Sequence, residues 1–246
     1  MSKSNWWDRN ARSGESSGFN LERDTKKKIK LNARKVVPQV YRYFDKEHHA
    51  EAFARGEIFV STLKRCREYE DPLQGDREEA FERYNTGRTI TGNGSDPAFV
   101  AMAAKAGIHI GPGSRNITIS NNSRTSYLHD AYVLCTTLRP FEGEELESFG
   151  KYCVRINDVG SFHSKLTKNL LLTSNIGKSV RGEIIYKERF YKEFESSPGL
   201  IGFVKPPDMY SSQREYRFLW YVPEGTNIVG KVVHCPEIAQ MVTRIA

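Results

Sequence analysis

The chain has 246 residues, 38% of them hydrophobic, with a mean hydropathy of -0.59 and a formal net charge of +7. This composition supports a globular core and argues against a membrane protein, because no apolar run approaches the roughly 20 residues of a spanning helix. The first residues contain no apolar stretch typical of a signal peptide, so we expect a cytoplasmic protein.

The positive charge is concentrated at the start of the chain. Residues 1–36 contain ten lysines and arginines against four acidic residues, which leaves a net charge of only +1 for residues 37–246. We therefore expect a basic, partly flexible N-terminal arm over 1–36 and a single folded domain over 37–246. Basic arms bind nucleic acid by neutralising phosphates, although a solubilising leader or a segment that docks on an acidic partner has the same composition.

The folded domain is predicted to open with a strand at 36–44, an amphipathic helix at 47–55 that ends at Gly56, and a second strand at 58–63. Residues 64–85 are charged and favour helix, in particular over 77–83. A loop rich in glycine and asparagine follows at 86–97. The alanine-rich run at 98–106 predicts a helix, and the alternation at 116–120 predicts a strand.

The second half of the chain consists mainly of short strands. Helices are expected only at 158–168 and at 236–243. The expected strands lie at 131–138, 151–156, 183–187, 215–222 and 228–234. Because short strands outnumber the helices and are interspersed with them, we expect an α+β domain with mostly antiparallel pairing.

The most informative segment lies at the start of the strand expected at 215–222. Gln213 and Glu215 stand two residues apart, and the period of a strand would direct both side chains to one face. A carboxylate beside an amide can hold a sugar hydroxyl and a nucleophile together, which favours glycosyl transfer. Taken alone, the segment also fits an edge strand with a solvated face.

Three segments together resemble the ADP-ribosyltransferase fold of the Arg-Ser-Glu class. Arg42 lies on the first strand, Ser61 and Thr62 end the second, and Gln213-Arg214-Glu215 follows in the matching order. The resemblance covers about residues 37–222 and implies a mostly antiparallel, split-sheet core with short flanking helices. Ser61 follows Arg42 by only nineteen positions, which is similar to the RNA- and DNA-directed branches of this fold.

The resemblance implies that NAD is the substrate and that ADP-ribose is transferred from it. Glu215 would be the catalytic carboxylate that stabilises an oxocarbenium-like state, and Gln213 would read the acceptor. Arg42 would bind the phosphates with its planar, permanently charged fork. Ser61 and Thr62 would brace the strand that carries Glu215 and would hydrogen-bond the carboxylate or the ribose.

An aromatic side chain is expected to stack on the nicotinamide. Tyr43, Tyr210 and Phe190 are the candidates. Residues 205–210, just before the strand, resemble the target-recognition loop of these enzymes. Gln213 resembles the residue found in members that modify asparagine or guanine.

The order of the later strands is also similar to that of proteins encoded among bacterial phage-defence genes. One relative in that setting is an mRNA-modifying ADP-ribosyltransferase toxin that is held by an antitoxin and a chaperone. The resemblance therefore implies a toxin of antiviral defence with RNA as its acceptor, and an antitoxin and a chaperone as candidate partners.

Two other functions remain open at this stage. The acidic residues at 68–79 could supply paired carboxylates to a metal-dependent nuclease, although the neighbouring arginines favour a solvated, ion-paired helix instead. A non-enzymatic module that binds RNA or a partner on a degenerate version of the fold is the second alternative. The spacing of the four cysteines and six histidines predicts no metal site.

Overall fold

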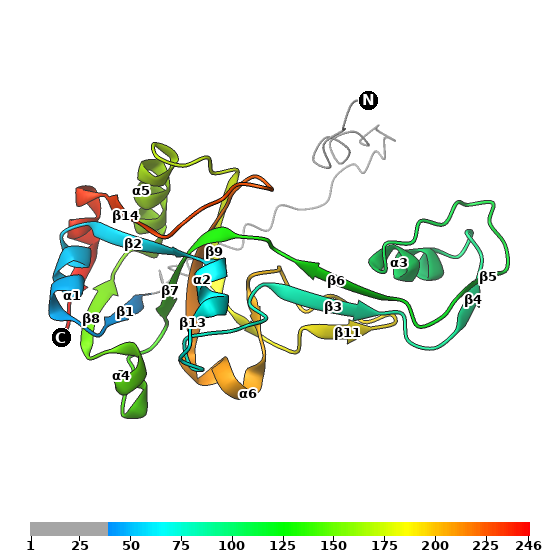
Figure 1. Ribbon diagram of the computed structural model, residues 1–246, viewed down its shortest axis with the longest axis horizontal. Coiled ribbons are helices and arrows are strands. Elements are labelled where there is room, and N and C mark those ends of the chain that lie inside the picture. Colours follow the sequence, from blue (N-terminus) through cyan, green and yellow to red (C-terminus); the bar gives the residue numbers. More distant parts are fainter. Residues whose placement is uncertain (1–38) are drawn as a thin grey trace, which may run out of the picture. The chain divides into compact units, whose positions relative to one another are not determined.

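The computed structural model describes residues 39–246, and the N-terminal arm over 1–36 lies outside the described residues (Figure 1). The described part is α+β, with mostly antiparallel strand pairs and few helices, as the sequence predicts. Within it, no helix is both long and apolar enough to cross a membrane.

The first elements follow the sequence prediction closely. They are β1 (Val40–Phe44), α1 (Glu47–Ala54) and β2 (Glu57–Thr62). Gly56 joins α1 to β2 with a φ of +93°, and an added Cβ would lie 2.4 Å from the Cys235 carbonyl oxygen. This position requires glycine for both its conformation and its space.

The main sheet is built around β7 (Ala131–Thr137). One edge of β7 pairs along its whole length with β13 (Glu215–Tyr221), which also pairs with β9 (Lys178–Glu183). The other edge pairs with β2 only at Val133 and Tyr132, and with β1 only at Thr137. The sheet is therefore split along this edge of β7, with β1 and β2 on either side of the gap.

Each side of the split extends into further strands. β2 pairs with β14 (Lys231–His234), whereas β1 pairs with β8 (Tyr152–Ile156), which pairs with β15 (Val242–Arg244). The larger core packs the sheet against α1, α5 (Val159–Leu171) and the 3-10 helix η3 (Pro236–Met241). Phe218 and Trp220 are fully buried there, and burying a side chain of this size contributes roughly 1.5–3 kcal/mol.

A smaller lobe comprises residues 81–127 together with β11 (Phe190–Lys192). It contains the three-stranded sheet β11-β3-β6, with β3 at Phe81–Asn85 and β6 at Ser123–Tyr127. The strands β4 (Ile90–Gly92) and β5 (Ile117–Ile119) pair with each other, and the chain segment between them contains α3 (Pro97–Lys105). Tyr84, Phe99, Met102 and Tyr191 form part of the lobe's own core.

The remaining elements are short, and several differ from the sequence prediction. They are α2 (Leu63–Glu68), α4 (Glu144–Phe149), β10 (Ile185–Tyr186), β12 (Val204–Lys205), α6 (Pro207–Tyr210) and the 3-10 helix η2 (Ser211–Gln213). The helix expected over 77–83 is wrong, because Ala80 adopts a φ of +59° and β3 begins at Phe81. The closing helix expected at 236–243 is instead η3 followed by β15. The elements β4, β6, α4, β11, β12, α6 and η2 were not predicted.

Candidate functional site

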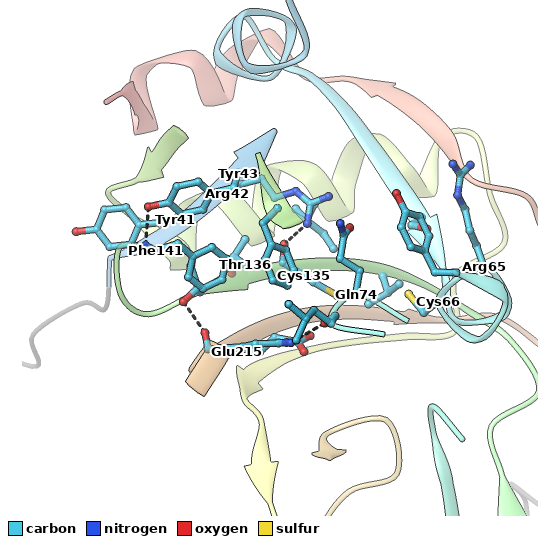
Figure 2. Close-up of a pocket in the computed structure, with 18 of the residues that line it drawn as sticks. Tyr41, Arg42, Tyr43, Arg65, Cys66, Gln74, Cys135, Thr136, Phe141 and Glu215 are labelled. Carbon is cyan, nitrogen blue, oxygen red and sulfur yellow. Dashed lines mark hydrogen bonds between the residues drawn. The ribbon is translucent and has the colours of Figure 1, made fainter. Parts of the chain in front are cut away.

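A cavity of about 130 Å³ lies where β1 and β2 part from β7 (Figure 2). Five of the residues proposed from sequence line it, although they come from three separate segments of the chain. They are Arg42, Tyr43, Ser61, Gln213 and Glu215. The split in the sheet thus places the predicted arginine, serine and glutamate around one space.

Arg42 lies at the gap in the sheet. Along the split edge of β7 no strand pairs with residues 134–136, and the Arg42 Nη1 group donates to the Cys135 carbonyl at 2.8 Å (Figure 2). Within residues 39–246 the other N–H groups of this guanidinium have no hydrogen-bond acceptor. Because a guanidinium carries five N–H donors, Arg42 can still bind an anion with a bidentate contact.

Glu215 belongs to a buried network of four charged side chains. Its Oε1 accepts from Arg217 Nε at 2.7 Å, and its Oε2 lies 2.8 Å from Lys205 Nζ. Arg217 also donates to both carboxylate oxygens of Glu79, at 2.7 and 3.1 Å. All four are at least 95% buried, and their charges balance.

This network keeps the Glu215 carboxylate ionised. Burial alone would raise the pKa of Glu215, but the neighbouring Arg217 and Lys205 outweigh burial and hold the pKa well below its usual range. Burial lowers the pKa of Lys205, but the neighbouring carboxylates of Glu215 and Glu79 outweigh burial and raise this pKa above its usual value. An anionic carboxylate oxygen accepts more than one hydrogen bond, so Glu215 retains capacity for a ligand hydroxyl.

Gln213 reaches the cavity, but not by the route that strand periodicity predicts. It ends η2, and β13 begins only at Glu215, because Arg214 between them adopts a φ of +46°. The amide Nε2 of Gln213 donates to the Leu73 carbonyl at 2.6 Å, so this side chain holds the rim of the cavity.

The other predicted residues divide between the cavity and its surroundings. Ser61 lines the cavity, whereas the buried Thr62 accepts from the Arg65 amide at 3.2 Å and caps the start of α2. Tyr210 lies outside the lining, where its hydroxyl donates to the Gly75 carbonyl and Lys205 Nζ lies 4.7 Å from its ring centroid. Phe190 lies on β11 in the lobe and does not line the cavity.

An aromatic wall closes one side of the cavity. Tyr43 stacks on Phe141 with ring centroids 4.8 Å apart, and Phe149 lies 4.8 Å beyond Phe141. The Tyr43 hydroxyl accepts from the Phe141 amide at 2.8 Å, which fixes the ring. Burial raises the pKa of Tyr43 to about 12, so its hydroxyl stays neutral. This wall offers a planar ligand a stacking surface.

Two cysteines also line the cavity, Cys66 from α2 and Cys135 from β7. A thiol hydrogen bond from Cys135 lowers the pKa of Cys66, and this bond together with burial raises the pKa of Cys135. Of the two thiols, Cys66 is the one whose pKa is lowered, so we expect it to react before Cys135.

The acidic residues at 68–79 are directed to different partners rather than to one centre. Asp76 forms a buried ion pair with Arg189, and Glu79 forms one with Arg217. Glu78 pairs with Arg83 on the surface. In the part of the chain that the structure describes, no three His, Cys, Asp or Glu side chains gather where they could hold a metal ion.

The sequence reasoning did not find the partners of Glu215. Glu79 is far from Glu215 along the chain, and Lys205 lies on the separate strand β12. Only Arg217 carried a local signal, because it stands at i+2 from Glu215 in a strand of large apolar residues. Phe141 and Phe149 come from irregular chain and a short helix, and no local pattern placed them near Tyr43.

No family model, curated protein or solved structure matches the chain in the three comparisons with known proteins.

Proposed function

We propose that this protein is an NAD-dependent ADP-ribosyltransferase toxin of anti-phage defence that transfers ADP-ribose to RNA. The observation that carries the proposal is the convergence of Arg42, Ser61, Gln213 and Glu215 on one cavity at the split of the sheet. These residues stand in the order of the Arg-Ser-Glu class, and a split-sheet core is what that resemblance implies.

The lining of the cavity has the chemical groups that NAD requires. Arg42 has free guanidinium donors for the pyrophosphate, and the exposed Arg65 also lines the cavity. The wall of Tyr43, Phe141 and Phe149 offers a surface on which the nicotinamide ring can stack.

Glu215 would supply the central electrostatic contribution. When bound, NAD supplies a glycosidic bond whose cleavage releases nicotinamide and develops positive charge on the ribose. The Glu215 carboxylate would accept a hydrogen bond from a ribose hydroxyl and stabilise that charge. Arg217 and Lys205 keep the carboxylate ionised and fixed in position. The acceptor would form the new bond to the ribose carbon and lose one proton to solvent, so the products would be nicotinamide, the ADP-ribosylated acceptor and a proton.

Labelled NAD tests the proposal directly. The full-length protein is incubated with NAD labelled in its adenylate part, together with separate samples of total RNA, DNA and protein. We expect label in the RNA, and we expect Glu215→Gln to reduce it by about 100-fold or more, the usual cost of losing one electrostatic stabiliser. Label in none of the three fractions would overturn the proposed activity.

Two controls separate chemistry from folding. Glu224→Gln changes an exposed glutamate in a loop and should leave transfer unchanged. Arg42→Lys keeps the charge but loses the bidentate fork, and it lies outside the buried ion network, so it should reduce transfer while preserving thermal stability. Expression of the wild type should slow bacterial growth, and Glu215→Gln should relieve this effect.

A further inference from the structure

We propose that the outer face of the β11-β3-β6 sheet binds single-stranded nucleic acid by stacking bases on Tyr127 and Phe190. This surface lies in the lobe, outside the cavity, and would hold the strand that carries the acceptor. The inference deepens the proposed function in that respect, but binding at this face requires no NAD.

Strand register places one set of side chains on this face. Phe81 is opposite Tyr127, and Arg83 is opposite both Thr125 and Phe190. The intervening residues Tyr84 and Tyr191 point to the other face, where they are buried in the core of the lobe. Figure 1 shows the three strands side by side. Side chains at alternate positions on adjacent strands form one continuous surface.

The first aromatic position is rigid and open on one side. Arg67 lies 5.4 Å from the Phe81 ring centroid and donates to three backbone carbonyls, those of Glu79, Leu128 and His129. Phe81 in turn stacks on Tyr127 with centroids 5.3 Å apart and an interplanar angle of 16°. Tyr127 is 56% exposed, although the tilted His129 ring lies 6.2 Å from it, so part of the Tyr127 ring is open to a base.

The second aromatic position lies across the same sheet. Phe190 is the first residue of the edge strand β11 and is 55% exposed. Between the two aromatic positions lie Thr125 and Arg83, which is paired with Glu78, and the exposed Lys192 follows at the next outward-facing position of β11. Aromatic rings separated by hydroxyl and basic groups are the usual composition of a surface that stacks bases and contacts the backbone.

The charge of the lobe favours a polyanion. Residues 81–127 contain five basic and two acidic residues, a net charge of +3, whereas the rest of 37–246 has a net charge of -2. Within the described chain, the exposed Arg88 and Arg115 have no carboxylate within salt-bridge distance, so their charges are available to phosphates. Arg124 is opposite Tyr84, and Lys105 Nζ lies 5.7 Å from the Tyr84 ring centroid, so these two cations belong to the other face of the sheet. An acidic peptide would also meet Arg88 and Arg115, but it lacks bases to stack on the exposed rings. The combination therefore selects nucleic acid.

The test measures binding by fluorescence anisotropy with the full-length protein and no NAD. The probe is a labelled single-stranded RNA of about 12 nucleotides, with DNA of the same sequence as a second arm. Salt at about 0.3 M reduces the purely electrostatic contribution of the remaining basic residues. We expect the Tyr127→Ala/Phe190→Ala double variant to bind RNA about 10-fold to 100-fold more weakly. Tyr127→Phe keeps the ring and should bind normally, as should Leu172→Ala, which removes an exposed apolar side chain from the end of α5.

Further outcomes decide the proposal in either direction. Photo-crosslinking of an RNA that contains 4-thiouridine should label the peptides that carry Tyr127 or Phe190. Equal weakening with DNA would support a stacking surface that does not select the sugar. Unchanged RNA binding by the double variant would overturn the proposal. So would an equal loss of binding to a double-stranded probe, or a loss seen only for polyglutamate, a polyanion without bases. If the RNA binds as expected while NAD is not consumed, the proposed transferase activity fails and this surface stands.

Discussion

Replacement of Glu79 by glutamine removes one charge from the buried network without touching the lining of the cavity. The Glu79 side chain is 1% exposed, and its two carboxylate oxygens accept hydrogen bonds from Nη1 and Nη2 of Arg217. The variant therefore leaves two buried cations, Arg217 and Lys205, beside the single carboxylate of Glu215. Removing one partner of a buried ion pair costs about 3–5 kcal/mol, since the remaining charge stays desolvated.

That cost corresponds to a large thermal shift. For a domain of this size, a loss of 3–5 kcal/mol lowers the Tm by about 6–20 °C. Two independent sites of this kind would together cost about 6–10 kcal/mol. Because Glu79 and Arg217 are partners, their losses should not add. We expect the Glu79→Met/Arg217→Met double variant to lose only about as much stability as Glu79→Met or Arg217→Met alone.

Urea unfolding followed by far-UV circular dichroism measures these free energies of unfolding, and thermal unfolding followed by the same signal measures the Tm. A Tm shift below about 2 °C for Glu79→Gln would contradict a buried, coupled network, because it would correspond to 1 kcal/mol or less. Additive losses in the double variant would contradict the pairing of Glu79 with Arg217.

Three further predictions follow from the same structure. Burial lowers the pKa of His163 from 6.5 to about 4, so the unfolded chain takes up the proton first and the free energy of unfolding should fall by about 3 kcal/mol from pH 6.5 to 4. His163→Asn should flatten this pH dependence in urea titrations, and an unchanged slope would contradict it. Iodoacetamide should alkylate Cys66 before the other thiols, and bound NAD should protect Cys66 from this reaction. Peptide mass spectrometry identifies the labelled cysteine, and a different cysteine labelled first would refute the prediction. Thr62→Ala should cost about 1 kcal/mol in urea unfolding and leave NAD affinity unchanged, whereas Ser61→Ala should weaken NAD binding measured by calorimetry; the reverse pattern would exchange their roles.

Local sequence patterns were sufficient to predict much of the fold. The strand-favouring composition of β7, β8 and β13 and the amphipathic pattern of α1 and α5 are properties of single segments, and these elements formed close to where they were expected. The helix expected over 77–83 failed because tertiary contacts determine this segment. Buried ion pairs hold Asp76 and Glu79, and the chain turns at Ala80 into a strand.

The candidate site was predictable only in part for the same reason. Arg42, Ser61 and Glu215 came from short segments that resemble a known order, and the structure brings them to one cavity. The side-chain roles depended on long-range contacts that no local pattern contains. Thr62 caps a helix, and the amide of Gln213 is taken by the Leu73 carbonyl.

Isothermal titration of NAD into the full-length protein is the most direct test of the central claim, that this cavity is an NAD site. We expect saturable binding by the wild type, and about 10-fold to 100-fold weaker binding by Arg42→Lys, the cost of losing charge-assisted hydrogen bonds. Glu224→Gln should bind as the wild type does. Absence of binding by the folded wild type, or equal affinity in Arg42→Lys, would contradict the assignment of the cavity.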